Sequence, residues 1–424
     1  MPDINEAKEP CQSSKHLGIC RRNRYNAMFM DTKEHLPPQA RGNDPASFAA
    51  YTMQERLPSI LEQVLRDNPY PQSVHAHLQA FRDELAEGFP QPFLDAGPDT
   101  PYWHAQWGRW GVVAWQELPW FLAETWFYRR ILYETGYYTA GPSQYHDPFF
   151  VVKQRALQEG LIQLADILPT VPSGFNEAAL RAWLRISLWG NQADFSNQAA
   201  LASATSQKGS EGRVLVDDGT AIWGYLEAQS EPKIDIICDN AGYELLNDLA
   251  LADWLLQAGT ARRLRLHLKA QPYYVSDAMP KDVLASVAAL RTSAVSELAS
   301  LGARLDTALH EERLELRNHL FWTTAETAFH LPDELVKTLA QADLLLFKGD
   351  VNYRRLADDR YWPHEMPFAA LANRVPRPYA ALRAIKSEIV CGLALGVDER
   401  VAAQDPGWLT EGRWGVIQFS QGEQ

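Results

Sequence analysis

The stretch that decides the fold is KIDIICDNAGYELLNDLALADWLLQAG, residues 233–259. Its first part, KIDIIC, is a short apolar run, and a helical pattern begins at about Tyr243. Runs that are apolar throughout are typical of strands covered on both faces, as in parallel sheets. The stretch therefore predicts a buried strand that leads through a short loop into a helix.

The same alternation continues toward both ends of the C-terminal half. Further apolar runs, which we expect to include the other strands, are GRVLVDD (212–218), AIWGYLEA (221–228), RLRLHLKA (263–270), ADLLLFKGD (342–350), SEIVCGLAL (387–395) and WGVIQFS (414–420). Helical segments such as PKDVLASVAALRTSAVSELASLG (280–302) separate them. This order predicts an α/β fold, namely a three-layer α/β/α domain with a mostly parallel sheet.

The N-terminal half has a different pattern, with apolar residues three and four apart. SFAAYTMQERLPSILEQVLRD (47–67) and FNEAALRAWLRISLWGN (175–191) predict helices, and WQELPWFLAETWFYRRILYETG (115–136) predicts a loop followed by an amphipathic helix. We therefore expect a polar tail over residues 1–45, an α-helical N-terminal subdomain over 46–205 and an α/β domain over 206–424.

Composition excludes several classes of protein. The 424 residues include 40 Lys and Arg against 53 Asp and Glu, a net charge of −13, which repels nucleic acids and anionic membranes. Four cysteines without a CxxC pair are too few for a disulfide framework or a zinc site. The N-terminus lacks a signal-peptide pattern and no apolar run reaches 18 residues. We expect a cytoplasmic protein that binds neither nucleic acid nor membrane.

Polar residues gather where the predicted strands end, which is where open α/β sheets bind ligands. Asp239 and Asn240 follow the strand IDIIC, and Asp277 follows RLRLHLKA. Carboxylate and amide oxygens suit a hard divalent cation. The same residue types also cap helices, so for each of them the capping explanation stays open.

Basic residues accompany these oxygens. Lys348, Gly349, Asp350, Asn352 and Arg354 crowd one turn in the second half of ADLLLFKGDVNYRRL (342–356), and a helix cap needs only one such residue. Arg383 and Lys386 precede the predicted strand SEIVCGLAL. Metal-binding oxygens together with Lys and Arg favour phosphoryl chemistry, because both neutralise the charge of a phosphate monoester. P-loop, GxGxxG, DxDx[TV], CxxxxxR and GxSxG motifs are all absent.

Several motifs of the chain resemble those of a known family, and the resemblance covers residues 45–424. DNAGYELLNDL (239–249), VSDAMP (275–280), FKGDVNYRRL (347–356) and LRAIKSE (382–388) resemble the metal-dependent damage-control phosphatases, formerly domain of unknown function 89. The branch is the one that acts on sugar phosphates and is also described as a protein-glutamate O-methyltransferase. Four more segments match its pattern, at 51–68, 119–131, 187–196 and 321–332.

The resemblance implies a metal-dependent phosphomonoesterase for small phosphorylated metabolites such as fructose 1-phosphate and fructose 6-phosphate. It implies that a divalent metal (Mn, Ni, Co or Mg) is held by Asp239, Asn240 and Asp277. It implies that the substrate is bound by Asp239, Asn240, Asp350, Val351, Asn352, Tyr353, Arg354 and Lys386. Asp239, Asp350 and Lys386 are the expected catalytic residues. The family's RTxK signature reads Arg383-Ala384-Ile385-Lys386 here, so one hydroxyl is lost, which bears on substrate preference.

Some alternatives remain open at this point. A methyltransferase that uses S-adenosylmethionine is the second hypothesis, although the first strand of the α/β part lacks the Gly-rich loop common in such sites. Asn191 and Asp194 either approach the site or cap a helix. Glu244 either contacts a metal ligand or lies near the positive helix N-terminus.

Overall fold

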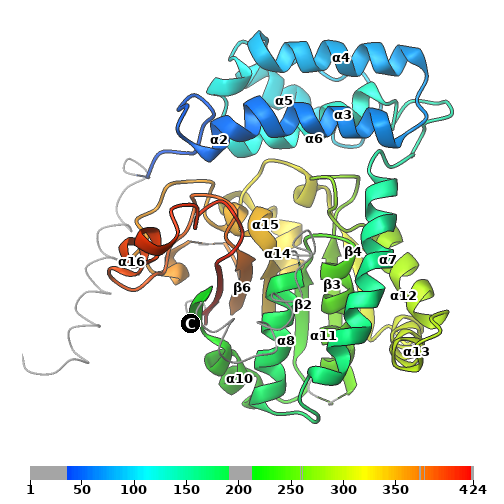
Figure 1. The fold of residues 1–424 in the computed structure, drawn as a ribbon, viewed down its shortest axis with the longest axis vertical. Coiled ribbons are helices and arrows are strands. Elements are labelled where there is room, and N and C mark those ends of the chain that lie inside the picture. The colour runs from blue at the N-terminus through cyan, green and yellow to red at the C-terminus, as the bar shows by residue number, and fades with distance from the viewer. Residues whose placement is uncertain are drawn as a thin grey trace, which may run out of the picture. The chain divides into compact units, whose positions relative to one another are not determined.

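The computed structural model describes residues 36–190 and 213–421, apart from 258, 260, 372, 373 and 377. Within these ranges the strands form a seven-stranded sheet in the order β1-β7-β6-β5-β2-β3-β4. Neighbouring strands run parallel except β6 and β7, which are antiparallel. The mostly parallel α/β fold is thereby confirmed (Figure 1). The strands are β1 (Val214–Asp217), β2 (Lys233–Ile237), β3 (Arg263–Leu268), β4 (Leu314–Asn318), β5 (Leu344–Lys348), β6 (Tyr379–Ala384) and β7 (Gly415–Ser420).

Two buried clusters lie on opposite faces of the sheet, because successive strand residues point to opposite sides. Ile234 and Ile236 of β2 belong to one cluster, and Ile237 belongs to the other. The first face is covered by α7 (Phe150–Ile167), α8 (Glu177–Trp189), α10 (Gly219–Glu227), α11 (Tyr243–Gln257), α12 (Pro280–Arg291) and α13 (Ser296–His310). The second face is covered by α14 (Asp333–Leu339), α15 (Gly349–Leu356), α16 (Val397–Gln404) and the short 3-10 turns η6 (Leu320–Thr323), η7 (Ala328–His330) and η8 (Phe368–Ala370).

The N-terminal helices build a third core, rich in aromatic side chains. They are α2 (Phe48–Tyr51), the π-helical turn η1 (Thr52–Arg56), α3 (Leu57–Asp67), α4 (Gln72–Glu87), α5 (Thr100–Trp110), the 3-10 turn η2 (Trp115–Glu117) and α6 (Trp120–Glu134). A further 3-10 turn, η3 (Leu168–Thr170), follows α7, and its Leu168 packs against the first face of the sheet. Trp103, Trp115 and Trp126 are fully buried there. The helix α6 was expected to be amphipathic but is buried from Trp120 to Leu132, because it packs both against this core and against the α/β part.

Two predicted strands are wrong. AIWGYLEA forms α10, in which Ile222 and Leu226 lie one turn apart and face the core. A short apolar run fits a buried helix and a buried strand equally well, and here the core takes the helical spacing. SEIVCGLAL is irregular, and the strand at this place is β6, which ends at Ala384 before it.

The irregular segment 387–395 keeps its backbone satisfied through side chains. Arg383 donates to the carbonyls of Ser387 and Ile389, and Gln418 donates to the carbonyl of Cys391. These bonds replace the ladder that a strand would have needed. The strand β4 was not expected, because LELRN has few apolar residues at the sheet edge.

The described residues from Gln39 onward belong to one compact unit. The helices α7 and α8, which fall within the expected helical subdomain, pack against α11 of the α/β part. Residues 1–35 of the expected polar tail, together with Asn191 and Asp194, lie outside the described residues. None of the helices in the described ranges combines the length and apolar character that a bilayer span requires.

Candidate functional site

The loops after β2 and β3 meet through their backbones. Asn240 and Asp277 form an isolated antiparallel bridge. The Ala241 N–H donates to the Ser276 carbonyl at 2.6 Å, and the Ala278 N–H donates to the Asp239 carbonyl at 2.7 Å. Three predicted metal ligands, Asp239, Asn240 and Asp277, are thus brought side by side.

The backbone of the loop is strained just before Asp277. Tyr274 and Val275 have φ values of 43° and 62°, in the left-handed region that non-glycine residues rarely adopt. The Tyr274 hydroxyl donates to Glu124 of α6 at 2.9 Å, and its ring stacks on Tyr128 with centroids 4.6 Å apart. Strain of this kind persists only where the surroundings enforce it, and here the α6 contacts do so.

Asp239 and Asp277 are a buried carboxylate pair with unused oxygens. Their residues are 3% and 1% exposed, and within the described part of the chain neither Oδ1 atom has a hydrogen-bond partner. Burial, then repulsion from Asp277 and Glu244, raises the pKa of Asp239 well above its usual range. Burial also raises the pKa of Asp277 to about 6, although Lys269 lies 2.9 Å from its Oδ2 atom. A divalent cation between the two would relieve both effects.

Asn240 and Glu244 complete the oxygen cluster. The Asn240 Nδ2 atom donates to Asp239 Oδ2 and to Glu244 Oε2, each at 2.9 Å. Its Oδ1 atom accepts from Ser276 Oγ at 2.6 Å and keeps a second lone pair. Among the described residues, no group of three or more His, Cys, Asp or Glu side chains is placed to hold a metal. A cation here would therefore rest on two carboxylates and one amide, a donor set that fits Mg²⁺ or Mn²⁺.

The end of β5 passes close to this cluster. Gly349 has a φ of +79°, and a Cβ atom at this position would lie only 1.9 Å from Asp239 Oδ2. Only glycine fits both the conformation and the space. The preceding Lys348 is fully buried, with its Nζ atom 3.0 Å from Glu244 and 2.9 Å from Asp248. Its charge is used to hold α11 against β5.

Asp350 lies at the centre of a second set of contacts. Its Oδ1 atom accepts from Arg383 Nε at 2.8 Å, from Ser387 Oγ at 3.2 Å and from the Lys386 N–H at 3.3 Å. Burial alone would raise the pKa of Asp350, but Arg383 and then Arg354 outweigh it and lower the pKa. Asp350 is therefore ionised and fixed at physiological pH.

Lys386 faces both sets of carboxylates. Burial lowers the pKa of its amine, and Glu244, Asp239 and Asp350 act against that effect. The side chain lies along Gly412, where a Cβ atom would be 3.1 Å from its Cε atom. Lys386 thus stands between the loop after β2 and the first turn of α15.

The remaining predicted residues point in different directions. The Asn352 Nδ2 atom donates to the carbonyls of Ile237, Cys238 and Lys348, and its Oδ1 atom is buried without a partner in the described ranges. The Tyr353 hydroxyl donates to Gln418 of β7 at 3.0 Å, inside the second core. Val351 packs into the N-terminal core.

Arg354 is a paired arginine. Its Nη1 atom is 2.5 Å from Glu124 and its Nε atom 2.7 Å from Asp359, while Trp120 lies under the guanidinium at 3.6 Å. Its charge is therefore already balanced by two carboxylates.

Several residues around the site had no signal in the sequence or only a weak one. Glu124 was visible as a lone acid in the apolar run PWFLAETW, and it joins α6 to Arg354 and Tyr274. Lys269 was visible at the end of β3. Arg56 gave no signal, since a charged residue on an amphipathic helix is usually solvated.

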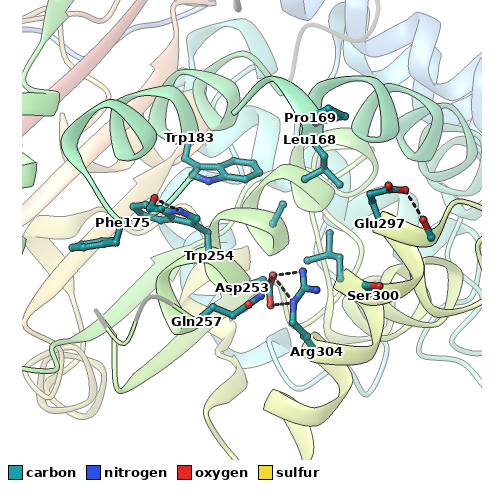
Figure 2. Close-up of a pocket in the computed structure, with 14 residues that line it drawn as sticks. Leu168, Pro169, Phe175, Trp183, Asp253, Trp254, Gln257, Glu297, Ser300 and Arg304 are labelled. Carbon is teal, nitrogen blue, oxygen red and sulfur yellow. Dashed lines mark hydrogen bonds and ion pairs between the residues drawn. The ribbon is translucent and has the colours of Figure 1, made fainter. Parts of the chain in front are cut away.

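A cavity of about 730 Å³ lies elsewhere, between α8, α11 and α13 (Figure 2). Trp183, Phe175 and Trp254 form its aromatic side, and Arg304 pairs with Asp253 at 2.7 Å. At 1.5 Å per residue, Trp254 lies about 15 Å along α11 from Glu244. The cavity contains none of the predicted site residues, so it is distinct from the site at the strand ends.

Comparison with known proteins decides the family. The family model described as the damage-control phosphatase ARMT1-like domain matches residues 52–401. The chain belongs to this family.

Individual relatives agree along nearly their whole length. The proteins named damage-control phosphatase ARMT1 of Danio rerio, Mus musculus and Homo sapiens are 31%, 30% and 29% identical to this chain. The matches cover 92%, 89% and 91% of this chain and 99%, 97% and 98% of those proteins. A crystal structure of a DUF89 family protein from Pyrococcus horikoshii has a TM-score of 0.50 at 13% identity, covering 92% of this chain and all of that one, which supports the fold. The family resemblance is confirmed, and with it the classification of this chain among the damage-control phosphatases.

Proposed function

We propose that this chain is a divalent-metal-dependent phosphomonoesterase that hydrolyses small sugar phosphates such as fructose 1-phosphate and fructose 6-phosphate. The observation that carries the proposal is the pair Asp239 and Asp277, two buried carboxylates with unused oxygens next to Lys386. Two adjacent buried anions are unfavourable unless a cation binds them, and the lysine supplies a contact for an anionic substrate.

Asp239, Asn240 and Asp277 would hold Mn²⁺, Ni²⁺, Co²⁺ or Mg²⁺. When bound, such an ion neutralises charge on the phosphoryl oxygens. Lys386 contacts the phosphoryl group from the side of Asp350. Asp350, whose pKa is lowered chiefly by Arg383 against the effect of burial, orients the attacking water and the lysine rather than taking up a proton. Water adds to phosphorus, the ester bond to the sugar oxygen breaks, and a proton from the water passes to that oxygen, so the products are the sugar and inorganic phosphate.

The neighbouring residues position these groups. Asn352 ties the end of β2 to the start of α15 through backbone carbonyls, so it fixes the distance between Asp239 and Asp350. Tyr353 and Arg354 anchor the other side of α15 to β7 and to α6. Val351 shields the site on the side of the N-terminal core.

The test compares Asp239→Asn and Asp277→Asn with wild type on a panel of hexose phosphates with Mn²⁺, Co²⁺, Ni²⁺ or Mg²⁺. Released phosphate is measured with and without chelator. We expect chelator-sensitive turnover in wild type and a loss of at least about 100-fold in each variant, since metal stabilisation is worth several kcal/mol. Asp253→Asn, which removes a buried carboxylate at the remote cavity, is the matched control. Turnover unaffected by chelator and by both site variants would refute the proposal, and a parallel assay with methyl-labelled S-adenosylmethionine tests the methyltransferase alternative.

A further inference from the structure

Two of the arginines around the site form ion pairs with carboxylates, whereas a third arginine does not. Arg383 is paired with Asp350, and Arg354 with Glu124 and Asp359. The side chain of Arg56, at the end of the π-helical turn η1, has neither a hydrogen bond nor an ion pair within the described residues. A guanidinium that is left without a partner among so many carboxylates is available to an anion from outside the protein.

The surroundings of Arg56 place it at the site. Met53 and Leu57 on either side of it belong to the same core cluster as Tyr128 and Val351, which follows Asp350. The residue itself is exposed, although burial acts to lower the pKa of its guanidinium. The side chain of Arg56 is therefore accessible to solvent although many protein atoms lie around it.

The groups that face Arg56 come from separate segments. Tyr128 and Glu124 of α6, Tyr274 of the strained loop and Asp350 of α15 act together to raise its pKa. Arg56 in turn contributes to lowering the pKa of Lys386, so the charge of each cation acts on the other. Glu124 and Asp350 are each occupied by another arginine, as described above. Neither carboxylate can therefore fully neutralise the charge of Arg56.

The backbone at Arg56 is also unusual. The turn Thr52–Arg56 is π-helical, whereas α2 before it and α3 after it are α-helical. An inserted π-helical turn rotates the residues within it relative to the flanking helix, and such turns occur often at functional sites. Here Met53 and Leu57 are buried in the core while Arg56 is exposed.

We infer that Arg56 is a second ligand of the substrate's phosphoryl group, opposite Lys386, contributed by the N-terminal helices. The inference rests on the proposed phosphatase function and extends it. A guanidinium binds two phosphoryl oxygens with parallel N–H bonds, which an ammonium cannot do. A complete phosphate-binding site then requires both parts of the chain, because Lys386 belongs to the α/β part and Arg56 to the helical part.

The experiment uses Arg56→Met, Arg56→Lys and a control, Arg66→Met. Arg66 lies on the continuing helix α3 with its side chain 68% exposed, so its loss removes the same charge from the outer surface. Binding of inorganic phosphate is measured by calorimetry in the presence of Mn²⁺, and kcat and KM are measured for the best sugar phosphate. Thermal unfolding verifies folding, since an exposed side chain without a partner should contribute little to stability.

We expect Arg56→Met to weaken phosphate binding and raise KM by roughly 10- to 100-fold, the loss typical of a charge-assisted hydrogen-bond pair. Arg56→Lys should lie between it and wild type, and Arg66→Met should match wild type. If wild type binds phosphate and turns over sugar phosphates but Arg56→Met does both equally well, the inference fails and the proposed function stands. If Arg56→Met raises KM while phosphate binding is unchanged, Arg56 contacts the sugar and the inference is likewise overturned. If wild type neither binds phosphate nor hydrolyses any ester, both fail.

Discussion

Gly349→Ala tests the geometry of the site at a single atom. The glycine has a φ of +79°, and its missing Cβ atom would lie 1.9 Å from Asp239 Oδ2. Ordinary contact begins at 3.4 Å, so the carboxylate would have to move by about 1.5 Å, the difference between these two distances. A misplacement of about 1 Å in a catalytic group can cost about 100-fold in rate.

Gly349→Ala also strains the backbone, and a control variant separates this strain from the effect of the clash. Alanine in the left-handed region costs about 1–2 kcal/mol at any position. Gly396 has a φ of +73° and nothing within 4 Å of its Cβ position, so Gly396→Ala carries that backbone cost without a clash. Gly396→Ala should therefore lose about 1–2 kcal/mol of unfolding free energy, and Gly349→Ala should lose about 1–3 kcal/mol more because of the clash with Asp239. Only Gly349→Ala should also lose at least about 100-fold in kcat/KM.

The assay combines three measurements on both variants. Urea unfolding gives stability, calorimetry with Mn²⁺ gives metal affinity, and phosphate release gives kcat/KM. The expected result is that both variants stay folded, with Gly349→Ala the less stable of the two, and that only Gly349→Ala loses metal affinity and turnover. If folded Gly349→Ala binds Mn²⁺ and turns over within threefold of Gly396→Ala, Asp239 is not held where the geometry puts it, and the site argument is wrong.

Three further predictions concern stability. Burial would raise the pKa of Asp147, but Lys153 and Lys281 outweigh it and lower the pKa, so its contribution to stability is fully present above its unfolded pKa of about 3.9 and is lost as pH falls from there through its lowered folded pKa. Asp147→Asn should accordingly flatten the stability curve between pH 5 and pH 3 in urea unfolding, and an unchanged slope would contradict this. Gly160→Ala should destabilise by about 1–3 kcal/mol, because its Cβ atom would lie 2.8 Å from Tyr243 Cα, backbone that cannot move cheaply. Gly224→Ala on α10, with nothing within 4 Å, should instead stabilise by up to about 1 kcal/mol, and shifts of equal sign in Tm would count against the packing explanation. Asp99→Asn removes a carboxylate 2.9 Å from the buried Arg129 but leaves Asp95 paired with that guanidinium, so it should cost about 1.5–3 kcal/mol, an expectation that a loss below about 0.5 kcal/mol in urea unfolding would overturn.

The local sequence pattern was sufficient to predict much of the fold. The runs at β2, β3, β5 and β7 and the helices α3, α8 and α11 were predictable, because side-chain period and burial are encoded along the chain itself. The rule that parallel strands present their carboxyl ends at one edge also brought Asp239 and Asp277 together in the prediction. The same rule selected Asp350 and its neighbours as candidates.

The sequence by itself therefore determined the layers of the protein and which residues stand at the strand ends. Only the tertiary structure decided whether residues 219–227 became helix or strand, since a short apolar run satisfies either. It also decided which cations are already neutralised: Arg354 is held by Glu124, 230 residues earlier in the chain, while Arg56, unremarkable in sequence, has no such partner among the described residues. Charge pairing depends on distances of a few ångströms between segments far apart along the chain, and no local pattern records those distances.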